Sequence, residues 1–344
     1  PRKGELTYYD DIGEAGRQHA LSKPFSDEER GLYLMRIGAL FSLLPPPPAR
    51  VLECGCGTGW LSRFLAQSGY DVVGTDVAPE AVRLAQEVPS FQRGAVPEFL
   101  VADSESLEFE SAFDIVIKSP GISAYLPEIL LAQHAGTRFT SGTALWFAEH
   151  PEARVIAVTG TKGNSTVSAL IAHLLRALGK KVALAGNLGL PLLELLDPPQ
   201  SPDWWVIELS SFQTREVAAV EVAVINNLHE EHLDWHGSRE RYADDKLALA
   251  RDAKAVLVNA ALPELRARLG AHARRIEFGN DAGWHVASDA ILRGSERVFD
   301  LAASPLPGTH NAMDLCAALA VLDAIVEYPI PAAPAIKDLL TLGR

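Results

Sequence analysis

Residues 154–178 read RVIAVTGTKGNSTVSALIAHLLRAL, and they decide how the second half of the chain folds. The apolar run RVIAVTG predicts a buried strand over residues 154–160, and the pattern from Val167 to Leu178 predicts a helix. Glycine and hydroxyl residues crowd the turn between them, GTKGNST. A strand that enters a helix through such a turn directs backbone N–H groups and the helix N-terminus at one point, which favours a bound phosphate.

Strand and helix patterns alternate on both sides of this stretch. Before it, we expect a helix over 60–68 and strands over 51–52, 70–75, 99–101 and 113–117. After it, we expect strands over 181–185, 205–208, 222–226 and 255–259. This alternation predicts an α/β fold with parallel sheets covered by helices.

The chain is long enough for two domains, and its composition narrows what they do. Residues 1–150, which include a helical pattern over Glu28–Leu44, are expected to form a Rossmann-like domain, and residues 151–328 a mostly parallel P-loop-type domain. With 44 acidic against 31 basic residues the formal charge is -13, so neither nucleic acid nor an anionic membrane is an expected partner. Three cysteines predict no disulfide framework or zinc site, and no apolar run reaches membrane length, so we expect a cytoplasmic protein.

The turn GTKGNST departs from the loop of nucleoside triphosphatases at one position. Those loops place lysine directly before the Ser or Thr, so that its ammonium reaches the terminal phosphates while the hydroxyl holds magnesium. Here Asn164 precedes Ser165, and Lys162 stands two residues earlier. A phosphate loop is still predicted, with one cation missing from its usual place.

Five motifs in order extend the comparison. They are GTKGNSTVSALIAHLL, AGNLGLPLLELL, WWVIELSSFQT, NNLHEEHLDWHGSRERYADDKLALA and LPGTHNAMDLCAALA. As a set they resemble the central domain of Mur ligases, most closely the MurD type, over about 117–344. The resemblance implies ATP-dependent addition of glutamate to UDP-N-acetylmuramoyl-L-alanine through an acyl-phosphate, a step of peptidoglycan precursor synthesis that supports cell wall biogenesis, cell shape and cell division.

The resemblance also implies roles for single residues. Lys246, His232 and Glu208 match catalytic positions, with Lys246 carbamylated, and Mg²⁺ would be held by Ser165, Glu208 and His232. The residues implied in ATP binding are Gly160, Thr161, Lys162, Gly163, Asn164, Ser165, Thr166 and Asn311. Those implied in substrate binding are Asn187, Ser119, Pro120 and Gly121.

Two of these residues can also be judged without the resemblance. Glu208 follows an apolar strand, where an unpartnered carboxylate would be costly, so a functional role is favoured. The segment His229–His232 reads HEEH, which suggests zinc; its i, i+3 spacing differs from the i, i+4 spacing of metalloproteases, so zinc is disfavoured.

Departures from the family pattern leave a second hypothesis open. Asn164 replaces the loop lysine, and Asp314 stands where a second asparagine is usual. The family has a third domain, of which residues 329–344 are expected to be only the start. A non-catalytic nucleotide-binding, truncated or chimeric protein therefore remains an alternative.

The first half carries a different signature. ECGCGTG at Glu53–Gly59 and the strand end at Asp76 suit a nucleotide-like cofactor. Residues of about 5–117 resemble a class I S-adenosylmethionine-dependent methyltransferase, which implies a third function, methyl transfer. The residues implied in binding its cofactor are Glu53, Gly55, Gly57, Gly59, Asp76 and Asp103. The same residues could instead face UDP, because MurD-type ligases also begin with a dinucleotide-like βαβ unit, or they could form an unliganded scaffold. The end of the methyltransferase pattern at residues 118–120 argues against methyl transfer.

Overall fold

The computed structural model describes residues 40–325 except 42–43, 89–95, 103–112, 191, 199 and 305. The chain divides into two compact units, which we call unit 1 (Pro1–Glu149) and unit 2 (His150–Arg344). Asp103, most of the helical pattern over Glu28–Leu44 and the segment 329–344 lie outside the described residues. Predictions for those segments stay predictions.

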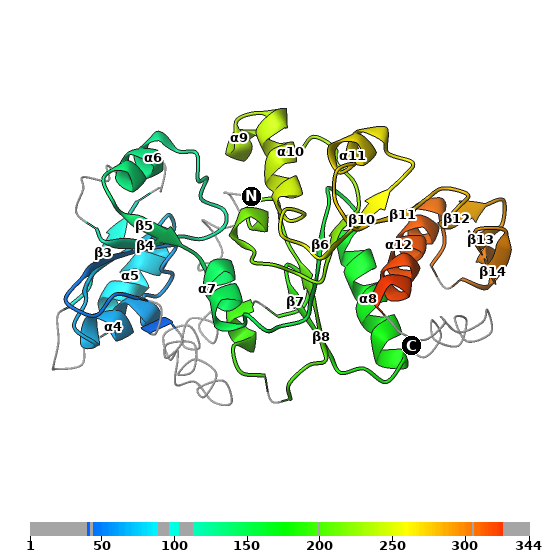
Figure 1. The fold of residues 1–344 in the computed structure, drawn as a ribbon. Coiled ribbons are helices and arrows are strands. Elements are labelled where there is room, and N and C mark those ends of the chain that lie inside the picture. Colours follow the sequence, from blue (N-terminus) through cyan, green and yellow to red (C-terminus); the bar gives the residue numbers. More distant parts are fainter. Residues whose placement is uncertain are drawn as a thin grey trace. The chain divides into compact units, whose positions relative to one another are not determined.

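Unit 1 is built on a five-stranded parallel sheet with strand order β3-β2-β1-β4-β5 (Figure 1). The strands are β1 (Arg50–Cys54), β2 (Asp71–Asp76), β3 (Glu98–Val101), β4 (Ile115–Ile117) and β5 (Arg138–Thr140). The helices are α4 (Trp60–Gln67), α5 (Pro79–Glu87), α6 (Pro127–His134) and α7 (Gly142–Glu149). The order reverses between β1 and β4, so the crevice for a ligand is expected at the carboxyl ends of these two strands.

Unit 2 is built on a nine-stranded sheet with strand order β14-β13-β12-β11-β10-β9-β6-β8-β7. The parallel strands are β6 (Val155–Thr159), β7 (Val182–Gly186), β8 (Trp204–Glu208), β9 (Val222–Ile225), β10 (Ala255–Asn259) and β11 (Arg275–Phe278). At one edge β12 (Trp284–Ala287), β13 (Ala290–Arg293) and β14 (Glu296–Asp300) pair antiparallel. All five residues of β6 are buried, as expected for a strand between two neighbours and two covered faces.

Five α-helices and three short 3₁₀ turns complete the described part of unit 2. The helices are α8 (Asn164–Ala177), α9 (Leu233–His236), α10 (Arg239–Ala248), α11 (Pro263–Arg268) and α12 (Thr309–Ile325), and the turns are η2 (Leu192–Leu195), η3 (Thr214–Glu216) and η4 (Leu301–Ala303). Apolar side chains of α8 and α12 share one buried core with the sheet, and the two helices lie side by side (Figure 1). This packing holds the N-terminal turns of both helices beside the loop that follows β6.

The α/β prediction and its parallel strands are confirmed, with shifts at the ends of elements. The strand over 255–259 is found as predicted, whereas α8 begins at Asn164, three residues before the predicted Val167. The phosphate loop therefore overlaps the first helical turn. The antiparallel strands β12 to β14 were not predicted, because they are short and lie outside the strand and helix alternation.

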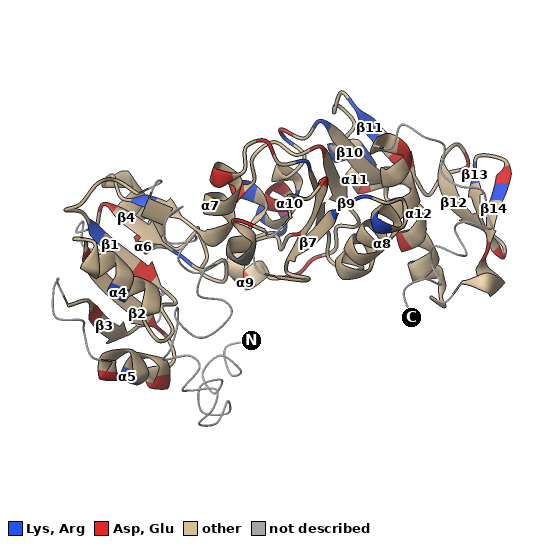
Figure 2. Cartoon of the chain, turned by 90° about the horizontal axis from the view of Figure 1, so that it is seen from below, with Lys and Arg blue, Asp and Glu red and all other residues tan. Residues whose placement is uncertain are grey.

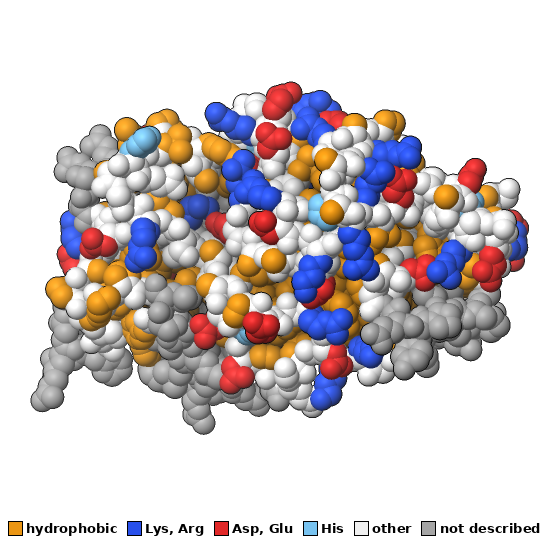
Figure 3. Space-filling model, in the orientation of Figure 1, with side chains coloured by type: hydrophobic (Ala, Val, Ile, Leu, Met, Phe, Trp, Pro, Cys, Tyr) orange, Lys and Arg blue, Asp and Glu red, His pale blue; other side chains and the backbone are white. Residues whose placement is uncertain are grey.

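Charged side chains are mixed on the surface. On α5, Arg83 pairs with Glu80 and Glu87, and both signs are visible on this helix in Figure 2. Basic and acidic groups also alternate over unit 2 on the face drawn in Figure 3. Among the described helices, none is both long and apolar enough to cross a membrane.

Candidate functional site

The loop between β6 and α8 is fastened by two asparagines that follow β9. The N–H groups of Thr161 and Lys162 both donate to Asn227 Oδ1, at 2.8 and 2.9 Å. The Lys162 carbonyl accepts from Asn226 Nδ2 at 3.0 Å and from Asn227 Nδ2 at 2.7 Å. Because β9 is the direct neighbour of β6, the strand order itself brings these asparagines to the loop.

Gly163 closes the loop in a conformation that favours glycine. Its φ is +81°, and an added Cβ would lie 2.8 Å from Asn226 Nδ2 and 2.9 Å from Asp314 Oδ1. Asp314 is buried on α12 and accepts from Asn226 Nδ2 at 3.1 Å. Burial raises the pKa of Asp314, although the Asn226 hydrogen bond lowers it in part. The second departure from the family pattern thus places a carboxyl group directly against the loop.

The first turn of α8 offers the donors that an anion needs. Gly163 is the N-cap and no side chain caps the helix, so the N–H groups of the first turn have no intrahelical acceptor. Ser165 Oγ donates to both carboxylate oxygens of Glu208, at 3.2 and 3.0 Å. Burial raises the pKa of Glu208, and the Ser165 hydrogen bond lowers it in part. A hydroxyl beside a carboxylate fits Mg²⁺, which prefers oxygen ligands shared with phosphates.

Lys246 reaches the same loop from α10. Its Nζ donates to the Gly160 carbonyl at 2.6 Å, and only 3% of the residue is exposed. Burial lowers the pKa of this ammonium to about 8. Tyr242 contacts both the lysine and the loop: its ring centroid is 5.0 Å from Lys246 Nζ, and its hydroxyl is 2.8 Å from Thr161 Oγ1.

The other predicted residues of unit 2 lie at different distances from the loop. Asn187 is close to Glu208, because its N–H donates to the Glu208 carbonyl at 3.0 Å. Asn311 is one turn before Asp314 on α12, and its side chain donates to the Pro307 carbonyl at 2.6 Å. His232 is half exposed, packs against Phe212 and has a positive φ of 52°. Within the described residues, no hydrogen bond or ion pair joins His232 to the serine and carboxylate.

A buried network behind the loop was missed by sequence reasoning. His236 Nδ1 lies 2.6 Å from Asp245 Oδ2, and His236 Nε2 lies 2.9 Å from Ser211 Oγ. Arg215 also pairs with Asp245. The order Ser, His, Asp is that of a hydrolase triad, but none of the three is more than 3% exposed, so no substrate could reach the serine. The network instead fixes α10, on which Lys246 follows Asp245.

In unit 1 the glycine loop uses its backbone groups internally. The Thr75 carbonyl accepts from the N–H groups of Gly55 and Cys56, at 2.7 and 2.9 Å. The N–H of Gly57 donates to Asp76 Oδ2 at 2.8 Å, and the N–H of Ala78 donates to Oδ1 at 2.9 Å. Asp76 therefore contacts the loop, and part of its hydrogen-bonding capacity is used by backbone N–H groups.

The two signatures of unit 1 meet where β1 and β4 end. A Cβ added to Gly55 would lie 3.6 Å from Ser119 Cβ, so the loop after β1 touches the Ser119–Gly121 segment after β4. Glu53 at the root of this loop is buried and accepts from Ser62 Oγ. Burial raises the pKa of Glu53 to about 7. Gly59 is covered by the Phe99 ring, which would lie 2.3 Å from an added Cβ.

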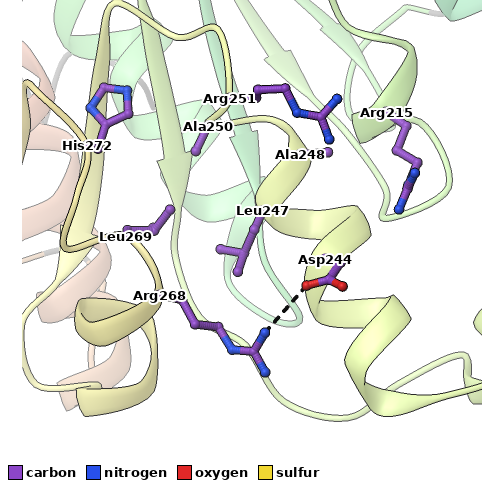
Figure 4. Close-up of a pocket in the computed structure, with 9 residues that line it drawn as sticks. All are labelled: Arg215, Asp244, Leu247, Ala248, Ala250, Arg251, Arg268, Leu269 and His272. Carbon is purple, nitrogen blue, oxygen red and sulfur yellow. Dashed lines mark ion pairs between the residues drawn. The ribbon is translucent and has the colours of Figure 1, made fainter.

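A hollow of about 540 Å³ lies on another side of α10 (Figure 4). Its lining residues are Arg215, Asp244, Leu247, Ala248, Ala250, Arg251, Arg268, Leu269 and His272. Arg215 pairs with Asp245, and Arg268 pairs with Glu264 at 3.2 Å and with Asp244 at 3.5 Å. Most of its positive charge is thus neutralised within the protein, and Lys246 is not in the lining.

Comparison with known proteins agrees with this division into two signatures. The family model described as "Mur ligase middle domain" matches residues 158–322. The model described as "Methyltransferase domain" matches residues 51–132. The first match contains the phosphate loop, and the second contains the glycine loop of unit 1.

Curated relatives match across more of the chain than unit 2 contains. UDP-N-acetylmuramoyl-L-alanine--L-glutamate ligase of Xanthomonas oryzae pv. oryzae (strain MAFF 311018) is 46% identical over 269 residues, which is 74% of this chain and 58% of that protein. The ligase of the same name from Xanthomonas campestris pv. campestris (strain 8004) is 48% identical over 263 residues, 73% of this chain and 56% of that protein. The chain thus spans little more than half the length of these relatives.

A solved structure shows the same fold at low sequence identity. The UDP-N-acetylmuramate:L-alanyl-gamma-D-glutamyl-meso-diaminopimelate ligase from Neisseria meningitides has a TM-score of 0.52 and 18% identity, covering 86% of this chain and 98% of that chain. The fold, the matched middle domain and the relatives agree. Through residues 158–322, which form a Mur ligase middle domain, this chain belongs to the Mur ligase family.

Proposed function

We propose that unit 2 binds ATP with Mg²⁺ and supports ATP-dependent addition of L-glutamate to UDP-N-acetylmuramoyl-L-alanine. The observation that carries the proposal is the uncapped start of α8 beside the Ser165 and Glu208 pair. It supplies N–H donors for phosphate oxygens and oxygen ligands for a metal at the same point. The choice of L-glutamate rests on the names of the two Xanthomonas relatives.

The proposed reaction requires positioning rather than a protein nucleophile. A carboxylate oxygen of the substrate bonds to the γ-phosphorus while the bond from that phosphorus to the bridging oxygen breaks, and ADP leaves. The amine of glutamate then bonds to the acyl carbon, loses a proton, and inorganic phosphate leaves. The chain's contribution is to hold phosphate oxygens on the N–H groups of α8.

Five residues of unit 2 have proposed tasks in that reaction. Glu208 and Ser165 would hold Mg²⁺, which when bound neutralises phosphate charge. Asn187 lies beside Glu208 and is proposed to face the substrate, while Asn311 at the start of α12 is proposed to contact adenine. His232 is proposed to contribute to the Mg²⁺ site. Because ATP is consumed, we place the reaction in the cytoplasm.

Calorimetric titration of MgATP tests the binding part of this proposal. Glu208→Gln should weaken MgATP binding at least about tenfold, since a metal ligand loses its charge. Glu152→Gln is the matched control, because Glu152 is an exposed carboxylate of unit 2, and it should leave binding unchanged. Equal affinities for the native chain and Glu208→Gln would contradict the assignment.

Phosphate release tests the ligase part. The chain is incubated with ATP, Mg²⁺, UDP-N-acetylmuramoyl-L-alanine and either L- or D-glutamate. Release that depends on L-glutamate supports the proposal, and release only with D-glutamate would reverse the choice of acceptor. MgATP binding without release from either would instead support the non-catalytic nucleotide-binding alternative.

A second candidate function, S-adenosylmethionine-dependent methyl transfer, concerns unit 1. It is favoured by the match over residues 51–132. Titration with S-adenosylmethionine and with UDP separates the two ligands proposed for this crevice. A heat of binding with UDP but not with S-adenosylmethionine would rule out methyl transfer. No heat of binding with either ligand would indicate that unit 1 is an unliganded scaffold.

A further inference from the structure

We propose that Asp314 is a specificity-determining residue of the phosphate loop: its carboxylate acts as an internal anion beside the start of α8 and lowers the affinity of the loop for polyphosphate. This inference rests on the proposed nucleotide site of unit 2. It concerns a buried carboxyl group at the loop that the proposed reaction does not use.

The carboxyl group of Asp314 lies against the turn that begins α8. Asp314 is in the second turn of α12, and α12 packs beside α8 (Figure 1). A Cβ added to Gly163, the N-cap of α8, would lie 2.9 Å from both carboxylate oxygens. Asn226 Nδ2 donates to Asp314 Oδ1 at 3.1 Å and to the Lys162 carbonyl at 3.0 Å. Helix packing and one shared amide therefore hold the charge at the loop.

No ion pair joins Asp314 to a lysine or arginine within the part of the chain that the structure describes. Lys246 donates to the Gly160 carbonyl instead, and Lys162 is exposed. Burial raises the pKa of the Asp314 carboxyl, whereas the hydrogen bond from Asn226 and the charge of His310 lower it. The carboxylate thus keeps its negative charge beside the loop without a direct cationic partner.

A negative charge at this point opposes the binding of phosphate. The first turn of a helix attracts anions through its N–H groups and its dipole, and a carboxylate beside that turn offsets part of the attraction. Asp314 is only 7% exposed, so it acts by its charge across Gly163 and not as a ligand contact. Like charges repel more strongly inside a protein than in water. The loop should therefore bind polyphosphate more weakly than the same loop with a neutral residue at position 314.

An isosteric substitution measures the effect of this charge. Asp314→Asn removes the charge but keeps an oxygen that can accept from Asn226. Tripolyphosphate with Mg²⁺, a probe without a base, is titrated calorimetrically at pH 8, far above the ordinary pKa of an aspartate. We expect Asp314→Asn to bind it at least about tenfold more tightly than the native chain. Asp323→Asn, which removes a charge further along α12, is the matched control and should change the affinity by less than about twofold.

Two further probes separate charge from other effects of the substitution. Inorganic phosphate carries less charge than tripolyphosphate, so its gain in affinity should be at least about threefold smaller. Equal gains for the two anions would mean that the loop had rearranged, and they would overturn the proposal. Adenosine should show no gain. A gain with adenosine and MgATP but not with tripolyphosphate would assign Asp314 to recognition of the base and overturn the proposal.

The remaining outcomes distinguish this inference from the proposed function. If MgATP binds the native chain and tripolyphosphate binds Asp314→Asn no more tightly than it binds the native chain, this inference alone fails. If MgATP binds neither the native chain nor Asp314→Asn, the proposed function fails as well.

Discussion

The two glycine loops of this chain share one local design but use their backbone N–H groups differently. In unit 1 a buried glutamate, Glu53, accepts a hydrogen bond from Ser62 on the helix that follows the loop. In unit 2 Glu208 accepts one from Ser165 on the corresponding helix. In both, a strand carboxylate is tied to the start of a helix, which sets the direction in which the helix N-terminus points.

The difference lies in which groups accept the hydrogen bonds of the loop N–H groups. The loop of unit 1 gives the N–H groups of Gly55, Cys56 and Gly57 to acceptors within its own unit. The loop of unit 2 gives the N–H groups of Thr161 and Lys162 to the side chain of Asn227, and no side chain caps the first turn of either α4 or α8. A glycine-rich sequence therefore indicates a tight strand-to-helix turn, but only the hydrogen-bond partners show which groups fasten that turn.

The largest expected effect comes from breaking the buried network of Ser211, His236 and Asp245 in unit 2. Asp245→Ala should lower the free energy of unfolding of unit 2 by about 3–5 kcal/mol, because it leaves His236 and Arg215 without their buried partner. Hydrogen exchange of the β6 and β9 amides measures this change within unit 2. Asp252→Ala is the control, since Asp252 is exposed and should change stability by less than about 0.5 kcal/mol. A loss below 1 kcal/mol for Asp245→Ala would contradict the role given to the network.

The buried carboxyl group of Glu53 should make the stability of unit 1 depend on pH. Burial raises the pKa of Glu53 from 4.5 to about 7, so between these values the folded state binds more protons than the unfolded state. The free energy of unfolding should therefore fall as pH rises from about 4.5 to 7, by roughly 3 kcal/mol in total.

Thermal unfolding of unit 1 across this pH range measures the effect. Glu53→Gln should remove the downward slope, because glutamine carries no proton to lose. Glu98→Gln, on the exposed side of β3, should keep it. A slope shared by the native chain and Glu53→Gln would assign the pH dependence to other groups.

The parts of the site that were predicted from sequence are those in which local chemistry suffices. The loop GTKGNST, its helix and the strand ending at Glu208 follow from short patterns of apolar, glycine and hydroxyl residues. The fastening by Asn226 and Asn227 depends on β9 lying beside β6, which no local pattern encodes. The same reason explains why the contact of Ser211 with His236 was missed.

Binding of MgATP should distinguish the two loops through a smaller change in the free energy of unfolding. MgATP at about 100 times its Kd should stabilise unit 2 by roughly 2.7 kcal/mol and leave hydrogen exchange in unit 1 unchanged. Glu208→Gln should reduce this stabilisation to about 1.4 kcal/mol or less at the same MgATP concentration, and Glu53→Gln should preserve it, because each carboxylate contacts its own loop. Slower hydrogen exchange of the β1 amides with MgATP would show that the glycine loop of unit 1 also binds the nucleotide.

The smallest effect separates two energetic costs of alanine at Gly163 in the phosphate loop. One is the cost of packing the added Cβ, and the other is the cost of the left-handed backbone conformation. Gly163 and Gly179 have nearly the same φ, +81° and +78°, but an added Cβ meets Asn226 and Asp314 at Gly163 and nothing within 4 Å at Gly179. Alanine at either site costs about 1–2 kcal/mol for its left-handed backbone. Gly163→Ala should cost roughly 1–2 kcal/mol more, because the neighbouring polar groups must move. Denaturant unfolding of both variants gives the difference, and Asp314→Ala should reduce it by removing one of the two obstacles. Equal costs at the two sites would mean that the loop adapts freely, and the contact between Asp314 and the phosphate loop would then impose no constraint on it.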